Sequence, residues 1–302
     1  MKRKDYSVLI NSIFKITILC ISTKAFANSN ICSSVYFNKG KKMVTRMDFE
    51  NIYLYRQNIG IDLYNLSFKK KEHPSTVIEI GPGTGEVFKS FLTQKNVPSF
   101  LMYFIEPDRS QKEKLLQYGS NVDVITNTLE QSFQNNMFPQ NVDTVIANFS
   151  LHWVTNVNKY FDQIYQHLNK NGIFSFSNTD TSRSFWTEID VQVQNKFPGC
   201  SLYNIEKSHS MNISDWENLT INSGFNILYK KEYVGTASVF ANARVAFDNF
   251  KQTVGTNYLK LSSEFTQKQV EDYVIHLLES RTNSDGRLKI KASGFAIVGE
   301  KK

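Results

Sequence analysis

The sequence predicts an α/β fold built on a seven-stranded, mostly parallel sheet that is flanked by helices. Two observations carry this prediction. After Met47, short apolar segments alternate with longer amphipathic ones, as in repeated strand–helix units. The first apolar segment runs into a glycine-rich turn, Gly81-Pro82-Gly83-Thr84-Gly85, which an amphipathic segment follows. With 302 residues, of which 41% are hydrophobic, the chain can bury a large core.

Seven segments are expected to form strands, because each is short, apolar and bounded by polar or turn residues. They are Thr76 to Ile80, Leu101 to Ile105, Asp123 to Thr126, Thr144 to Ala147, Ile173 to Ser177, Phe225 to Val234, and Lys289 to Val298. The start of the last segment alternates at Leu288, Ile290 and Ala292, which indicates an edge or antiparallel strand. Together with the glycine turn, this order predicts a Rossmann-like sheet whose last strand is antiparallel.

Helices are expected between the strands. Phe49 to Phe68 has apolar residues at helical spacing and predicts a helix or helix pair ahead of the sheet. The other expected helices are Val87 to Leu92, Gln111 to Tyr118, Lys159 to Leu168 with a stop at Asn171-Gly172, and a segment from the Ser214/Glu217 capping box to Gly224. Two more, near Val239 to Phe250 and Gln267 to Leu278, fall between the last two strands, where a helical lid over the strand ends could be built.

The net charge of +7 is concentrated in residues 1–46, which hold nine Lys or Arg and one acid, Asp5. Since that segment contributes +8, the remaining residues sum to −1. Such a balance lacks the broad basic surface that binding to a phosphate backbone requires, and we expect no nucleic-acid partner. The three cysteines, Cys20, Cys32 and Cys200, form no CxxC pair, and no metal centre is expected.

The glycine turn predicts that a ligand approaches the backbone closely at a helix N-terminus. The next residue, Glu86, favours one ligand over another. A nicotinamide dinucleotide would place its diphosphate at this helix N-terminus, where a carboxylate repels it. S-adenosylmethionine has no phosphate and carries ammonium and sulfonium charges. The turn of Gly81, Gly83 and Gly85 therefore predicts S-adenosylmethionine as the cofactor and disfavours an oxidoreductase.

Further cofactor contacts are expected where the next strands end. Glu79, just before the turn, is suited to the methionine ammonium, and Glu106, 25 residues after Gly81, to the ribose hydroxyls. Three residues after the third strand are candidates for adenine binding through the Asn amide and main-chain groups: Asn127, Thr128 and Leu129. Asn148 leaves the fourth strand at the same edge and completes the predicted cofactor site.

The methyl acceptor is expected beside the run from Asn148 to Val154. Methyl transfer is an in-line displacement that mainly needs alignment and exclusion of water. A carboxylate acceptor is already ionised at neutral pH and needs no base, and Trp153 could donate its indole N–H to it. Alternatively, His152 acts as the base for a hydroxyl or amine acceptor. A third possibility is an inactive partner protein that only binds the cofactor.

Four stretches of the sequence resemble class I S-adenosylmethionine-dependent methyltransferases of the small-molecule carboxyl type: VIEIGPGTG, FIEPD, DTVIANFSLHWV and NKNGIFSFS. The run from Leu151 to Val154 is similar to juvenile hormone acid methyltransferases, and more distantly to trans-aconitate and malonyl-carrier-protein methyltransferases. The resemblance spans about Phe49 to Lys302. It implies methyl-ester formation on a small carboxylic acid gripped by Gln57 and Trp153. Asn127 departs from the family pattern, in which an Asp is common at this place.

We expect two parts in the chain, a basic leader at 1–46 and a methyltransferase domain at 47–302. The leader imitates a secretory signal, with Lys2 to Lys4, an apolar run from Val8 to Ser22 and Ala25-Phe26-Ala27 as an A-x-A cleavage site, but Lys15 interrupts the run. The alternatives are a cleaved signal peptide, which implies secretion or the periplasm, and an unstructured leader, which implies the cytoplasm where the cofactor is found. No stable membrane insertion of the mature domain is expected.

Overall fold

The computed structural model describes residues 46–71, 73–93, 98–180, 184–203, 211–254 and 258–302. All of them belong to one compact unit, Val44–Lys302. The predicted leader, with Cys20 and Cys32, lies outside the described residues apart from Arg46, so the expectations for it stay predictions. Among the described residues, no helix is long and apolar enough to span a membrane.

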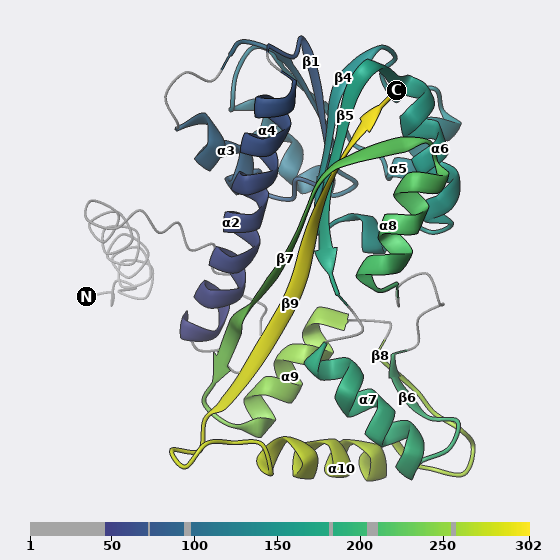
Figure 1. The fold of residues 1–302 in the computed structure, drawn as a ribbon. Coiled ribbons are helices and arrows are strands. Elements are labelled where there is room, and N and C mark those ends of the chain that lie inside the picture. The colour runs from purple at the N-terminus through teal and green to yellow at the C-terminus, as the bar shows by residue number, and fades with distance from the viewer. Residues whose placement is uncertain (1–45, 72, 94–97, 181–183, 204–210, 255–257) are drawn as a thin grey trace, which may run out of the picture. The chain divides into compact units, whose positions relative to one another are not determined.

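A seven-stranded sheet forms the centre of the described chain, in the order β3-β2-β1-β4-β5-β9-β7 (Figure 1). The strands are β1 (Thr76–Ile80), β2 (Leu101–Ile105), β3 (Val122–Ile125), β4 (Val142–Asn148), β5 (Leu168–Thr179), β7 (Phe225–Phe240) and β9 (Leu288–Lys301). Neighbours among β1 to β5 pair in parallel, and β9 is antiparallel to both β5 and β7. The predicted sheet with an antiparallel last strand is confirmed, and the edge position belongs to β7.

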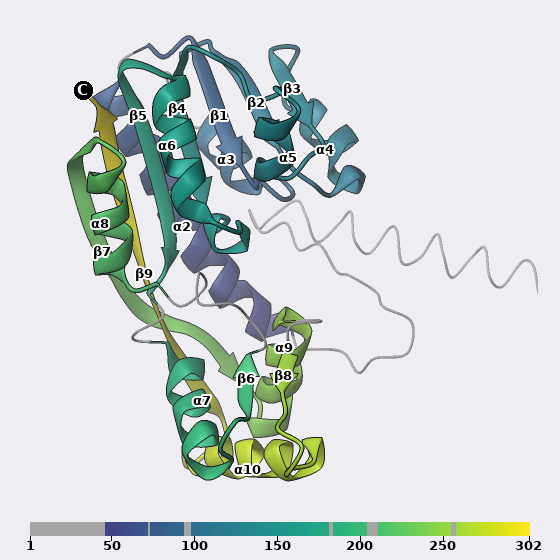
Figure 2. The ribbon, with the colours of Figure 1, turned by 90° about the vertical axis from the view of Figure 1, so that its right-hand side faces the viewer.

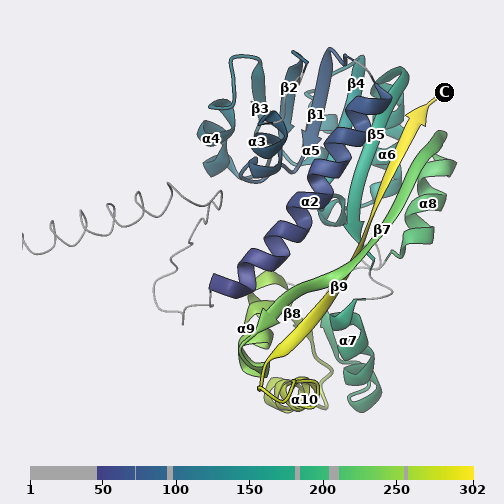
Figure 3. The same ribbon diagram turned by 60° about the vertical axis from the view of Figure 1, so that its left-hand side comes forward.

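Helices cover both faces of this sheet. On one face lie α5 (Leu129–Gln134), α6 (Val157–His167) and α8 (Ile213–Asn222) (Figure 2); on the other lie α2 (Arg46–Lys70), α3 (Glu86–Leu92) and α4 (Lys112–Leu116) (Figure 3). Each face has its own apolar core, one around Phe161, Phe176 and Trp216 and one around Phe88 and Phe104. Because both faces are covered, a strand such as β1 is buried along almost its whole length and therefore has the continuous apolar sequence from which it was predicted.

A third apolar core belongs to a module that we call the lid: α7 (Phe185–Lys196), β6 (Ser201–Tyr203), α9 (Ala243–Val254), β8 (Tyr258–Lys260) and α10 (Gln267–Glu279). Residues 234–240 of β7 pair with residues 288–293 of β9 beyond the point where Gly294 pairs with Thr179 at the end of β5. This two-stranded ribbon extends past the carboxyl edge of the sheet and runs to the lid (Figure 1). The lid therefore lies on the side of the sheet where the parallel strands end.

Several predicted boundaries were wrong. Helix α8 is capped two residues earlier than expected, because the Asn212 side chain accepts hydrogen bonds from the amides of Ser214 and Asp215. Glu217, predicted to close the capping box, instead pairs with Lys230 at 2.7 Å. Val239 and Phe240 belong to β7 and not to α9. Helix α6 ends at His167 and β5 begins at Leu168, so the expected helix stop, Asn171-Gly172, lies within β5. Helices α5 and α7 and the small antiparallel β6–β8 sheet were not predicted.

Asp143 connects three strands at the edge of the sheet opposite the lid. Its carboxylate accepts hydrogen bonds from the amide and hydroxyl of Ser75, the amide of Thr76 and the side chain of Asn169, and lies 3.6 Å from the Lys71 ammonium. Burial alone would raise the pKa of Asp143, but these hydrogen bonds outweigh it and lower the pKa to about 2. The ionised form is therefore the one that stabilises the fold.

Replacing Asp143 with alanine is expected to lower the free energy of unfolding at pH 7 by at least about 2 kcal/mol, the value that corresponds to the lowered pKa. Because the folded-state pKa is depressed, this stabilisation is present above pH ~4 and disappears as the pH falls toward ~2. Urea unfolding at several pH values measures both effects. Asp272→Ala, in an exposed pair with Lys268 on α10, is the control and should cost ~0.5 kcal/mol or less. A difference between wild type and Asp143→Ala that does not change from pH 7 to 3 would contradict the account.

Candidate active site

The glycine turn joins β1 to α3 at the carboxyl edge of the sheet. Gly81, Gly83 and Gly85 have φ values of 67°, 57° and 74°, in the left-handed region that favours glycine. The Gly81 amide donates to the carbonyl of Ile105 on β2 (2.9 Å), and the Gly85 amide donates to the carbonyl of Pro82 (3.0 Å). Backbone hydrogen bonds, one to β2 and one within the turn, therefore fix the turn at both ends.

The three glycines differ in what surrounds them. A Cβ on Gly81 would lie 2.5 Å from Cβ of Ser150, and one on Gly85 would lie 2.4 Å from the ring of Tyr118. A Cβ on Gly83 would meet no atom within 4 Å. Packing within the protein therefore accounts for Gly81 and Gly85. At Gly83 the backbone borders open space, as the close approach of a ligand requires.

Glu106 ends β2 and connects it to the glycine turn. Its side chain is 7% exposed, one carboxylate oxygen accepts from the Gly83 amide, and the other accepts from the Asp108 amide, both at 2.9 Å. Each oxygen keeps a second lone pair, so the carboxylate can still accept hydrogen bonds from two hydroxyl groups. The structure thus brings the two predicted contacts, Gly83 and Glu106, together.

Glu79 is the second buried acid at this edge. Its side chain is 2% exposed, and its Oε2 accepts a 2.6 Å hydrogen bond from the hydroxyl of Tyr64 on α2. Burial, the largest effect, raises the pKa of Glu79, the Tyr64 hydrogen bond lowers it, and the charge of nearby Glu106 raises it. The net pKa is about 7. Within the described part of the chain, neither Glu79 nor Glu106 has an ion pair with Lys, Arg or His. Two neighbouring buried acids that no described cation pairs with make this place suited to a cation.

The chain turns sharply after β4. Asn148 accepts from the Ser177 hydroxyl (2.7 Å) and donates to the carbonyl of Arg56 on α2 (3.3 Å), which connects three elements. Phe149 then has a φ of 50°, unusual for a residue with a side chain, and its amide donates to the Ser177 carbonyl. The Ser150 hydroxyl donates to the carbonyl of Ile80 at 2.6 Å. Such strain at a strand end is typical of functional sites.

His152 and Trp153 follow on a short 3-10 helix, Leu151–Trp153. Nδ1 of His152 lies 3.0 Å from Oδ1 of Asn178, and since that oxygen also accepts from the Thr179 amide, Nδ1 is assigned as the protonated nitrogen. Trp153 is 56% exposed, and its ring centroid lies 4.7 Å from that of His152. Both residues therefore stand beside the carboxyl edge, as predicted.

A family model described as a methyltransferase domain matches residues 53–230, which is more than half of the chain. The chain belongs to this methyltransferase family. The methyltransferase also shares its fold with a candidate methyltransferase from Bacillus halodurans (12% identity, 80% of this chain and 98% of the other, TM-score 0.54) and with the YcgJ protein of Bacillus subtilis (16% identity, 81% and 99%, TM-score 0.50). No curated protein matches the chain. The expected enzyme class and its cofactor, S-adenosylmethionine, are confirmed at the level of the family.

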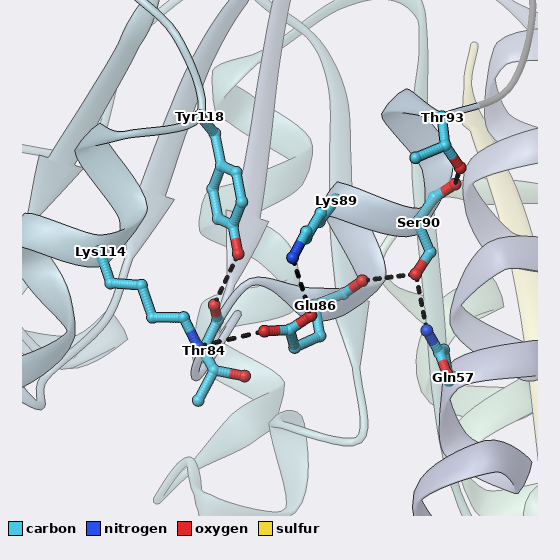
Figure 4. A network of polar contacts seen from close by, with 8 residues as sticks. All are labelled: Gln57, Thr84, Glu86, Lys89, Ser90, Thr93, Lys114 and Tyr118. Atoms are coloured by element: carbon cyan, nitrogen blue, oxygen red, sulfur yellow. Dashed lines mark hydrogen bonds and ion pairs between the residues drawn. The ribbon is translucent and has the colours of Figure 1, made fainter. Parts of the chain in front are cut away.

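Glu86, which was expected from the sequence to repel a diphosphate, is paired with two cations in this methyltransferase. Its carboxylate lies 3.1 Å from the Lys114 ammonium on α4 and 3.9 Å from that of Lys89 (Figure 4). These two cations offset the charge of Glu86, so its carboxylate is weaker evidence against an anionic ligand at the start of α3 than the sequence indicated. The buried acids at this edge that lack such a partner among the described residues are Glu79 and Glu106.

Gln57, predicted to hold the acceptor carboxylate, lies on α2 and faces α3. Its amide nitrogen donates to the Ser90 hydroxyl at 2.6 Å, and that hydroxyl donates to the carbonyl of Glu86 (Figure 4). The Gln57 amide is thus used in a contact between α2 and α3. The sequence did not indicate this contact.

The three predicted adenine contacts follow β3 at the same edge. Asn127 donates from its amide to Sδ of Met137 (3.1 Å), Thr128 caps α5 through its hydroxyl, and Leu129 is buried in the core. The side chains of Thr128 and Leu129 are therefore used for folding. The Thr128 amide also donates to the Gln131 side chain, and its carbonyl accepts from Ser132. In the described residues, no three His, Cys, Asp or Glu side chains gather as a metal site.

Proposed function

We propose that this methyltransferase transfers the methyl group of S-adenosylmethionine to a small carboxylic acid and so forms a methyl ester. The main support for S-adenosylmethionine as the cofactor is the buried pair of acids, Glu79 and Glu106, beside the open space at Gly83. Glu79 holds the methionine ammonium, and Glu106 accepts from the ribose hydroxyls. The left-handed turn, closed by Gly81 and Gly85, leaves the backbone at Gly83 open to the cofactor.

Further contacts complete the proposed cofactor site along the carboxyl edge. Asn127, Thr128 and the Leu129 amide border the adenine, while Asn148 borders the methionine part. This order follows the sheet, in which β1 lies between β2 and β4 and β3 lies beyond β2. A cofactor that lies along the carboxyl ends of these strands would place its adenine at β3, its ribose at β2 and its methionine part at β1 and β4.

For the acceptor, we propose a carboxylate held by Trp153. A carboxylate oxygen attacks the methyl carbon, the carbon–sulfur bond breaks, and its electron pair stays on sulfur, giving a methyl ester and S-adenosylhomocysteine. No proton is released, so the site needs no base. The exposed indole of Trp153 is available to donate its N–H to the carboxylate and to exclude water from one side.

A hydroxyl or amine acceptor is the second candidate, and one observation favours it. With the proton on Nδ1 directed to Asn178, the lone pair of a neutral His152 is on Nε2, as in a general base. A pH–rate profile separates the two acceptors. Loss of rate below pH ~6.5 supports a histidine base, while a rate that does not depend on this ionisation supports a carboxylate.

Replacing Trp153 with alanine is expected to lower turnover of the preferred carboxylic acid by about ten- to a hundredfold, the value of one hydrogen bond to a charged group. Affinity for S-adenosylhomocysteine should change less than about twofold, because Trp153 is assigned to the acceptor. Steady-state kinetics on a panel of carboxylic acids, with calorimetry, measures both. Ile221→Ala, equally exposed but on α8, is the control. Unchanged turnover in Trp153→Ala would show that Trp153 does not hold the acceptor.

A further inference from the structure

Tyr64 is a fully buried side chain whose polar end is at the proposed cofactor site. It lies on α2, is 0% exposed, and its hydroxyl donates to Oε2 of Glu79 at 2.6 Å. Its ring stacks on Phe91 at a centroid distance of 4.7 Å and contacts Phe88 at 5.9 Å. Because aromatic rings of α3 hold the phenol, its hydroxyl has one position relative to the glutamate.

The surroundings of Glu79 otherwise favour its neutral form. Glu106 faces it from the end of β2, and its strand neighbours in register, Phe104 and Ile146, are buried and apolar. Burial and the charge of Glu106 both raise the pKa of Glu79. Among the described residues, the Tyr64 hydrogen bond is the contact that favours the carboxylate. Burial and Glu79 in turn raise the pKa of Tyr64, which keeps its proton and remains a donor.

A phenol differs from a cation in this position. A Lys or Arg beside Glu79 would neutralise it and compete with any bound ammonium group. The phenol donates one hydrogen bond to one oxygen and brings no charge, so the negative charge of Glu79 stays available. No described side chain is seen to hydrogen-bond the other oxygen, Oε1.

We propose that Tyr64 is a positioning residue for the cofactor: its hydroxyl holds Glu79 charged and in place, with Oε1 directed to the methionine ammonium. This inference rests on the proposed role of Glu79. Tyr64 does not touch the reacting atoms, and it acts only through the carboxylate that it orients.

Calorimetry of Tyr64→Phe with two ligands tests the proposal. S-adenosylhomocysteine carries the ammonium, whereas 5′-methylthioadenosine has the same nucleoside thioether without the amino-acid part. We expect the affinity for S-adenosylhomocysteine to fall about five- to tenfold at pH 7, less at pH 8.5, because loss of the hydroxyl moves the ionisation of Glu79 to higher pH. The affinity for 5′-methylthioadenosine should not change.

The outcomes separate the inference from the proposed function. Equal losses for both ligands, or no loss for either, would overturn the role of Tyr64, whereas a wild-type protein that binds neither ligand would overturn the proposed function. Tyr258→Phe removes a similar bond, from Tyr258 to Glu271 in the lid at 2.9 Å, and should leave both affinities unchanged. In a Glu79→Gln protein, whose neutral amide does not need the phenol, Tyr64→Phe should change the affinity for S-adenosylhomocysteine less than about twofold. A full loss there would also refute the proposal.

Discussion

Glu79→Gln is expected to lower the affinity for S-adenosylhomocysteine about a hundredfold, while the ligand-free protein becomes more stable at neutral pH. The affinity falls because a buried carboxylate paired with an ammonium group contributes roughly 3 kcal/mol, and a neutral amide cannot replace that charge. One substitution that lowers ligand affinity and raises stability indicates a site where the Glu79 charge has no opposite charge beside it until the ligand binds.

The gain in stability follows from the pKa of Glu79, which burial raises from 4.5 to about 7. Because the folded protein binds this proton more tightly than the unfolded chain does, Glu79 contributes its full stabilisation below pH ~4.5. This stabilisation is lost as the pH rises through ~7. At pH 8 the wild type carries an ionised buried acid, whereas the Glu79→Gln protein has a neutral amide in its place. We expect Glu79→Gln to unfold with a free energy about 1 to 3 kcal/mol higher at pH 8, and with little difference at pH 5.

Urea unfolding at the two pH values and calorimetry at pH 8 measure these effects. Glu86→Gln is the matched control, since Glu86 is also an acid beside the glycine turn but pairs with Lys114 and Lys89. It should change the affinity by less than about threefold. If Glu79→Gln binds S-adenosylhomocysteine as well as the wild type, Glu79 does not hold the ammonium.

The second large effect is a contrast between two glycines of the same turn. Gly85→Ala is expected to destabilise the protein by about 3 kcal/mol, because a Cβ there lies 2.4 Å from Tyr118 and the φ of 74° disfavours alanine. Gly83→Ala meets no neighbour, so only its φ of 57° should cost stability, about 1 kcal/mol. Its Cβ points into the space proposed for the cofactor, and the affinity for S-adenosylhomocysteine should fall at least about tenfold.

Thermal or urea unfolding and ligand titration of both variants distinguish packing from binding. We expect Gly85→Ala to lose mainly stability and Gly83→Ala mainly affinity. If Gly83→Ala bound the ligand normally, the open space at Gly83 would not be the cofactor site.

The sequence was informative where the determinants of structure are local. Strand β1 and the turn from Gly81 to Gly85 were predictable, because a strand buried on both faces is continuously apolar and a left-handed turn requires glycine. The lid was predicted only in outline. Helix α7 and the strands β6 and β8 are defined by tertiary packing in a separate core, and β6 and β8 are too short for a clear periodicity.

At the site, residue types were predictable from the sequence but their partners were not. Of the two cations beside Glu86, Lys89 is three residues away in the sequence, but Lys114, at the shorter distance, comes 28 residues later. Tyr64 lies within an apolar helical pattern and showed no signal of its own, yet its hydroxyl reaches Glu79 across the packed α2–sheet interface. Contacts of this kind depend on how a helix is placed on a sheet, and the spacing of residues does not determine that.

The most direct test of the cofactor site is a calorimetric titration of the full chain with S-adenosylhomocysteine at pH 8 and pH 6. We expect one site with a dissociation constant in the micromolar range or tighter at pH 8, and about tenfold weaker binding at pH 6, where Glu79 must lose a proton to bind the ammonium. No binding at ligand concentrations up to ~1 mM would show that this edge of the sheet does not bind the cofactor.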